Sequence, residues 1–166
     1  MVQVRIEGLL SIKKGYLVIL FLIAIDLVSK FVAEENLVFG EAIPLIPILD
    51  LLLVFNSGIA FSIFDFNNNV FSFGLSLLGL LIVFYLHSLY KSEESSINSF
   101  SLILIIAGAL GNILDRLPDG VVTDFLFFHV GNTSFFIFNF ADAFISIGAA
   151  LFFLTEFKKF LQNRSG

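Results

Sequence analysis

Four long runs of apolar residues constrain the fold of this chain of 166 residues more than any other feature. They cover about residues 15–32, 70–90, 100–117 and 138–157. A helix of about 20 predominantly apolar residues can cross the hydrocarbon core of a bilayer. Because lipid cannot satisfy exposed backbone polar groups, each run is predicted to be a transmembrane helix. We therefore expect an all-α membrane protein in which residues 1–166 form a single domain.

The composition agrees with this class and excludes several kinds of site. The chain is 58% hydrophobic and 14% charged, whereas soluble domains average about 25% charged residues. It has no cysteine, which excludes disulfides, thiolate metal sites and cysteine nucleophiles. His87 and His129 are far apart and lack the spacing of metal ligands. No basic stripe indicates a nucleic-acid partner, and no metal or cofactor is predicted.

The lysine and arginine residues indicate how the spans are oriented. Four spans place both termini on one side of the membrane, together with the loop at 91–98. All nine basic residues lie on that side except Lys30 and Arg116. By the positive-inside rule, both termini and this loop are predicted to be cytoplasmic. The first run is interpreted as a retained anchor, because no small-residue cleavage site follows it.

Two segments on the outer side are not predicted to span. Residues 33–57 contain Pro44 and Pro47, which rule out a helix interior at those positions. We expect short strands on the membrane surface there, and a loop or strand at 121–137. Residues 59–66 are predicted to form a short interfacial helix, with a plain connecting turn as the alternative.

The third run is expected to approach other helices closely, because it carries several small residues. These are Ala107, Gly108, Ala109 and Gly111.

Ionisable residues are rare in the apolar runs, and those present are predicted to meet at one depth. Inserting such a group costs at least about 2.5–3.5 kcal/mol, so it is usually functional. Asp26 and Lys30 can pair along one helix face near the outer end of the first span. This pair either only offsets the cost of burial or braces a site. The other groups at this level are Asp115, Arg116, Asp124 and Asp142.

Two carboxylates at this level, Asp124 and Asp142, form a candidate catalytic pair. Held close in a partly desolvated cleft, they would share a proton. One could then take a proton from water while the other protonates a carbonyl oxygen or a leaving amine. Asn112, Asn139 and Arg116 could orient the scissile carbonyl or stabilise its developing negative charge.

Other interpretations of these residues stay open at this point. Asp115 is predicted to pair with Arg116. Taken alone, Asp124 could be a solvated loop acid and Asp142 a buried, hydrogen-bonded residue. The alternative function is an ion- or proton-coupled carrier that uses the same carboxylates. Carriers tend to place their sites near the midplane between repeats, and no repeat is evident here.

Five blocks in order resemble the lipoprotein signal peptidases (signal peptidase II), a family of bacterial membrane aspartic peptidases. The blocks are residues 26–30 (DLVSK), 56–61 (NSGIAF), 108–116 (GALGNILDR), 122–125 (VTDF) and 138–142 (FNFAD). The resemblance covers nearly the whole chain. It departs at Ala107, where the family often has a second glycine, but alanine is still small.

The resemblance implies an activity and a set of site residues. Asp124 and Asp142 would be the catalytic pair of an endopeptidase that removes the signal peptide from diacylglyceryl-modified prolipoproteins, cutting before the lipidated cysteine. Family positions that line the site are matched by Asn56, Asn112, Arg116 and Asn139. The family has a small extracytoplasmic β-cradle and a surface helix, and no metal or organic cofactor is implied. We expect a monomer in contact with lipid in the bacterial inner membrane, with its active site at the outer face.

Overall fold

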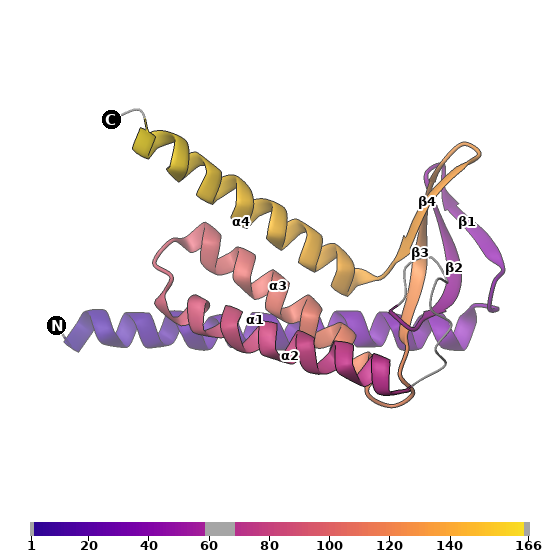
Figure 1. Ribbon diagram of the computed structural model, residues 1–166, viewed down its shortest axis with the longest axis horizontal. Helices are drawn as coiled ribbons and strands as arrows, with labels where there is room; N and C mark the ends of the chain where they lie inside the picture. The colour runs from indigo at the N-terminus through magenta and orange to yellow at the C-terminus, as the bar shows by residue number, and fades with distance from the viewer. Residues whose placement is uncertain (1, 59–68, 165–166) are drawn as a thin grey trace.

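The computed structural model describes the backbone of residues 2–58 and 69–164 and the side chains of residues 12–58 and 72–164. The described residues form four long helices and one four-stranded sheet, which lies at one end of the helices (Figure 1). The helices are α1 (Val2–Asn36), α2 (Asn69–Ser92), α3 (Ser96–Arg116) and α4 (Phe140–Arg164). Each is long and apolar enough to cross a membrane. The predicted four-span scaffold is therefore confirmed.

Most helix ends lie beyond the apolar runs that predicted them, but α3 ends at Arg116 and α4 begins only at Phe140, because Phe138 belongs to a strand. α1 continues through Ala33 and two glutamates to Asn36, four residues past the predicted boundary. Alanine and glutamate are good helix formers, so the loss of apolar residues marks a change of depth and not the end of the helix. The start of α1, the end of α4 and the α2–α3 connection all lie at the end of the bundle opposite the sheet (Figure 1).

α3 is the central helix of the bundle. It packs against α1, α2 and α4, and it is the most buried of the four. Its inward residues join α1 and α2 in one apolar core, which includes Ile19, Ile23, Val83, Leu102 and Ile106. Many large apolar side chains on the outer faces of α1, α2 and α4 are exposed, as expected of helices surrounded by lipid.

Two glycines let α3 approach its neighbours. A Cβ atom at Gly111 would lie 2.6 Å from Asp26 Oδ2 of α1. A Cβ atom at Gly108 would meet the backbone carbonyl of Ala141 in α4. Neither position leaves room for a side chain, which confirms the predicted close helix approach at these two residues.

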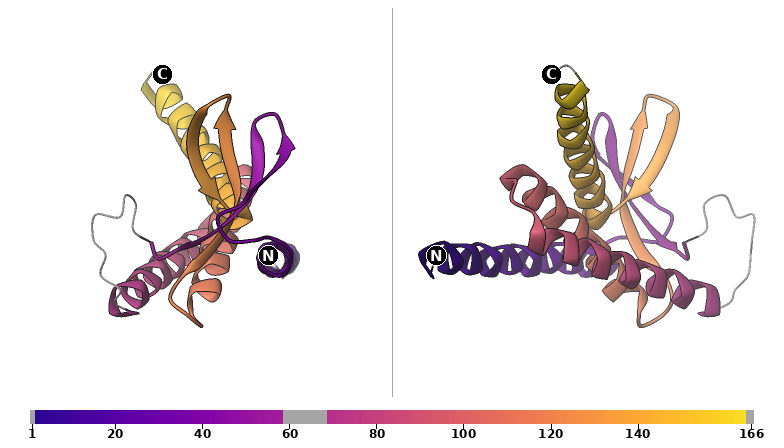
Figure 2. Two further views of the ribbon diagram at one scale, coloured as in Figure 1. Left: turned by 90° about the vertical axis from the view of Figure 1, so that its right-hand side faces the viewer. Right: turned by 60° about the vertical axis from the view of Figure 1, so that its left-hand side comes forward.

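The outer segments form strands, as the prolines and turn residues predicted. The strands are β1 (Ala42–Ile46), β2 (Leu49–Asn56), β3 (Val122–Val130) and β4 (Thr133–Phe138). They pair antiparallel in the order β1-β2-β3-β4. The left view of Figure 2 faces this sheet, with α1 seen along its axis. The predicted interfacial helix at 59–66 lies outside the described residues.

The packing of α3 against α4 gives a test with a matched control. Gly108→Ala should lower the melting temperature of the detergent-solubilised protein, because the added methyl group meets the Ala141 carbonyl; overpacking typically costs about 1–3 kcal/mol. Gly74→Ala, in α2, is the control, since a Cβ there has nothing within 4 Å. Equal melting temperatures for the two variants would contradict the close packing.

Candidate active site

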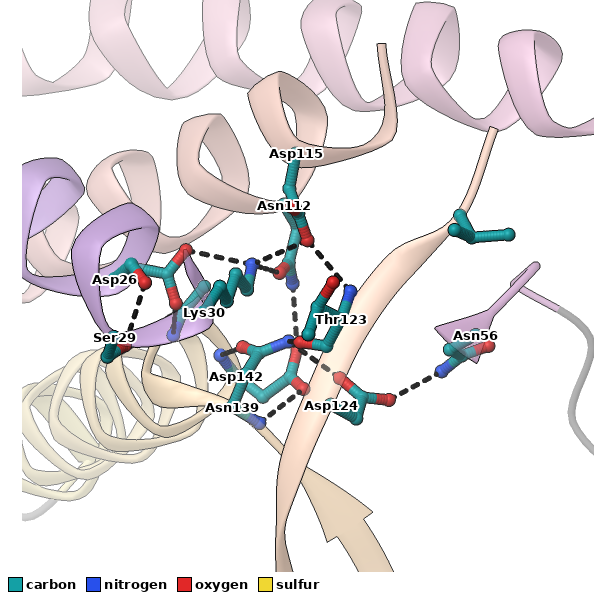
Figure 3. A network of polar contacts seen from close by, with 12 residues as sticks. Asp26, Ser29, Lys30, Asn56, Asn112, Asp115, Thr123, Asp124, Asn139 and Asp142 are labelled. Carbon is teal, nitrogen blue, oxygen red and sulfur yellow. Dashed lines mark hydrogen bonds and ion pairs between the residues drawn. The ribbon is translucent and has the colours of Figure 1, made fainter. Parts of the chain in front are cut away.

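Polar side chains from both halves of the chain meet where the sheet joins the helices (Figure 3). One continuous network of hydrogen bonds and ion pairs links eight of the nine residues predicted for the site. They are Asp26, Lys30, Asn56, Asn112, Asp115, Asp124, Asn139 and Asp142. The ninth, Arg116, lies beside this network.

The sequence around Asp142 forms a capping box at the start of α4. Asn139 directly precedes the helix, and its Oδ1 accepts a hydrogen bond from the backbone N–H of Asp142 at 2.9 Å. In return, Asp142 Oδ2 accepts from the backbone N–H of Asn139 at 3.3 Å. Reciprocal bonds of this kind satisfy two of the free N–H groups of a helix start. The spacing of three residues therefore holds the Asp142 carboxylate in the first turn.

Asp124 lies on β3 and is almost completely buried, with 3% of its surface exposed. Asn139 Nδ2 donates to its Oδ1 at 2.7 Å, and Asn56 Nδ2 donates to its Oδ2 at 3.0 Å. Asn139 thus contacts both aspartates, which fixes Asp124 and Asp142 on either side of one amide. The interpretation of Asp124 as a solvated loop acid is wrong, because β2 and β4 enclose its strand.

Burial raises the pKa of Asp124 from 3.8 to about 6. The hydrogen bond from Asn56 opposes this shift, the negative charge of Asp142 adds to it, and the hydrogen bond from Asn139 again opposes it. A carboxyl group with this pKa can hold a proton close to neutral pH, as general acid–base chemistry requires.

Asn112 links Asp142 to a buried cation. Its Nδ2 donates to Asp142 Oδ1 at 2.8 Å, and its Oδ1 accepts from Lys30 Nζ at 2.8 Å. The same ammonium lies 2.8 Å from Asp26 Oδ2 and 3.2 Å from Asp115 Oδ2. Lys30 is only 1% exposed, so these partners compensate a charge that would otherwise be very costly to bury.

Asp26 does more than neutralise Lys30. Its Oδ1 accepts a hydrogen bond from the backbone N–H of Ala141 at 2.8 Å, in the first turn of α4. The predicted ion pair along α1 is confirmed. Of its two interpretations, the contacts favour the second, because Asp26 holds the start of the helix that carries Asp142.

The structure corrects the prediction that Asp115 pairs with Arg116. Asp115 Oδ2 faces Lys30 and accepts from the backbone N–H of Thr123 at 2.8 Å. Consecutive residues of a helix point about 100° apart, so Asp115 and Arg116 face different directions, and Asp115 faces α1 and β3. Among the described residues, the buried Nε of Arg116 has no hydrogen-bond partner.

Two residues that contact the network were missed as site residues. The buried Thr123 hydroxyl donates a hydrogen bond to the Glu34 carboxylate, which joins β3 to α1. No role was predicted for Glu34 from the sequence. Its spacing of four residues from Lys30 was a usable signal, because it places both on one helix face. No group of three or more histidine and acidic residues in the described part of the chain could hold a metal.

Comparison with known proteins identifies the family. Residues 18–158 match the family model described as signal peptidase (SPase) II. The chain belongs to the signal peptidase II family. It is 35% identical over 147 residues to the lipoprotein signal peptidases of Brucella ovis and Brucella canis, covering 89% of this chain and 91% of each relative.

Solved structures agree with this assignment. Two structures described as bacterial membrane enzymes, each 27% identical in sequence, match with TM-scores of 0.73 and 0.76. The matches cover 89% and 87% of this chain, and 89% and 92% of the respective structures. This signal peptidase II homologue is therefore a multi-pass membrane protein and a peptidase of the aspartic class. The alternative of a carrier is not supported.

The raised pKa of Asp124 predicts how stability depends on pH. A carboxyl group that is harder to ionise when folded stabilises the protein fully below its unfolded pKa, and this contribution is lost as pH rises through the folded pKa. From pH 4 to pH 7, the wild-type protein should therefore lose stability relative to Asp124→Asn, by on the order of 2–3 kcal/mol.

The measurement is the difference in melting temperature between these two proteins in detergent, across pH 4–8. The amide also changes the hydrogen bonds, but that offset does not vary with pH. Glu41→Gln, at an exposed position, is the control and should follow the wild type throughout. A difference that stays constant with pH would show that Asp124 does not titrate in this range.

Proposed function

We propose that Asp124 and Asp142 are the catalytic pair of this signal peptidase II homologue. The supporting observation is that Asn139 donates to both carboxylates, through its side-chain Nδ2 to Asp124 and through its backbone N–H to Asp142. Two acids held by one residue, close enough for their charges to interact, can share a proton. They come from different elements, β3 and α4, so the tertiary fold is what brings them together.

The substrate is a prolipoprotein whose cysteine carries diacylglycerol, and cleavage removes the signal peptide before that cysteine. The relatives are lipoprotein signal peptidases, which supports this substrate class. The location of the pair supports it too. Both aspartates lie where the sheet meets the ends of the helices (Figure 3). A diacylated cysteine keeps its chains in the bilayer, so its scissile bond must be cut at that level.

Hydrolysis proceeds by general acid–base catalysis. The deprotonated carboxylate of the pair takes a proton from water as the water oxygen attacks the scissile carbonyl carbon. The protonated carboxyl, for which Asp124 is suited by its pKa of about 6, donates its proton to the carbonyl oxygen. The tetrahedral intermediate then collapses: the carboxyl that took the proton from water donates it to the leaving amine, and a hydroxyl of the intermediate returns its proton to the other carboxylate. The pair returns to its singly protonated state.

Arg116 and the asparagines support this chemistry. The charge of Arg116 interacts with those of Asp124 and Asp142, so it can stabilise the negative charge that develops on the substrate carbonyl oxygen. Asn56 and Asn112 each donate to one aspartate and so orient the pair. Asp26, Lys30 and Asp115 hold these elements together.

The remaining parts of the proposal concern the protein in its membrane. Residues 1–166 form one domain, and the protein acts as a monomer surrounded by lipid in the bacterial inner membrane. Both termini and the α2–α3 connection are cytoplasmic, and the sheet with the catalytic pair is on the outer face. The distribution of lysine and arginine supports this orientation.

The catalytic pair is tested by cleavage of a purified diacylated prolipoprotein. Asp124→Asn and Asp142→Asn should each lower turnover at least about 1,000-fold, and the double variant should be hardly worse, because the two act as a unit. The unlipidated precursor should not be cleaved by the wild type. Asp119→Asn, at an exposed turn, is the matched control and should retain full activity. Near-normal turnover by either single variant would refute the assignment.

The orientation is tested by cysteine labelling, which is clean because the chain has no cysteine of its own. Single cysteines replace Glu94, in the α2–α3 connection, and Asn132, in the β3–β4 turn; both positions are exposed. A membrane-impermeant thiol reagent added to intact cells should label position 132 and spare position 94. A cytosolic thiol protein serves as the control for leakage. The reverse pattern would place the catalytic pair in the cytoplasm and contradict the proposal.

A further inference from the structure

Three charged residues of α1 form a row that faces the site. Asp26, Lys30 and Glu34 are spaced by four residues, so they lie on one face of the helix. Each contacts a different element that carries a site residue: Asp26 contacts α4, Lys30 contacts α3 and Glu34 contacts β3. The first two were predicted as site residues from their position near the outer end of the first span, whereas Glu34 was given no role.

Thr123, next to Asp124, is held through all three of its polar groups. Its backbone N–H donates to Asp115 Oδ2 at 2.8 Å, and its carbonyl accepts from Asn139 Nδ2 at 3.3 Å. Its hydroxyl donates to the Glu34 carboxylate. Figure 3 shows Thr123 and Asp124 as neighbours on β3, with Asp115 on one side and Asn139 on the other. The Glu34 contact is the one that fixes the Thr123 side chain.

The strand needs this support, because at the site it is paired on one side only. Thr123 and Asp124 pair with Phe55 and Val54 of β2, whereas the pairing of β3 with β4 reaches only as far as Leu126↔Phe138. On the other side, the backbone of Thr123 contacts the side chains of Asp115 and Asn139 and not a strand. Side chains of consecutive residues in a strand point to opposite faces, so a rotation of the backbone at Thr123 also turns the Asp124 carboxylate. Side-chain contacts must therefore help to set the direction of Asp124.

We propose that Glu34 is a positioning residue for Asp124 and acts through the Thr123 hydroxyl. This inference rests on the proposed catalytic role of Asp124. Glu34 itself is exposed, whereas Asp26 and Lys30 are fully buried. Removing Glu34 leaves no unpaired buried charge, so it should affect geometry more than stability. It should therefore change catalysis in a protein that still folds.

The experiment measures kcat, KM and melting temperature with a diacylated prolipoprotein in detergent. Glu34→Ala and Thr123→Val should each lower kcat about tenfold with little change in KM, because a small misplacement of a catalytic group is costly in rate. The double variant should match either single variant, since both remove the same hydrogen bond. Glu34→Gln keeps an oxygen that accepts the hydroxyl, so it should retain kcat within about twofold.

Two controls separate the possible outcomes. Glu35→Ala removes the neighbouring exposed acid of α1 and should leave kcat unchanged. Asp124→Asn tests the proposed function: if it remains active, the catalytic assignment fails, and the role of Glu34 fails with it. If Asp124→Asn is inactive but Glu34→Ala has normal kcat, only the positioning role is overturned. Three other outcomes would also overturn the positioning role. The losses in kcat could multiply in the double variant, or Glu34→Gln could be as slow as Glu34→Ala. The third is a fall in melting temperature without a fall in kcat.

Discussion

The ammonium group of Lys30, buried within the helix bundle, is the interaction on which the rest of the site depends. It lies within 3.2 Å of Asp26, Asn112 and Asp115, which come from α1 and α3. A buried cation must be surrounded by acceptors, and each acceptor here makes a further contact. Asp26 reaches the start of α4, Asn112 reaches Asp142 and Asp115 reaches the backbone of β3. One desolvated charge thereby fixes the relative positions of α1, α3, α4 and the sheet.

The amide of Asn139 extends this order to the candidate catalytic pair. As the residue before α4, it makes the reciprocal bonds of a capping box with Asp142, and its Nδ2 also donates to Asp124. The helix start and the site therefore share the same side chain. Its environment is dry enough to raise the pKa of Asp124 to about 6, yet each carboxylate retains hydrogen-bond donors. A pair that exchanges a proton with water and substrate requires both properties.

The close approach of the helices makes this arrangement possible. Gly108 and Gly111 let α3 contact the first turn of α4 and Asp26 of α1, so the polar network has no room for lipid. The apolar outer faces of the helices remain exposed to the bilayer. The site lies at the end of the bundle, where the sheet meets the helices (Figure 3). A peptidase that cuts lipid-anchored chains needs its carboxylates near the membrane surface and not at the middle of the bilayer.

The amino-acid sequence by itself determined the four spans, the sheet segments, the Asp26–Lys30 pair and the identity of the candidate catalytic residues. These follow from local properties: apolar length, proline and turn residues, helical spacing, and the cost of charge in hydrocarbon. It did not determine which partner each polar group takes. Asp115 pairs with Lys30 and not with its neighbour Arg116, and Glu34 binds Thr123, although both acids could have been solvated. Only the tertiary structure decided these contacts, because they join residues distant in the chain, and their geometry depends on how helices and strands pack.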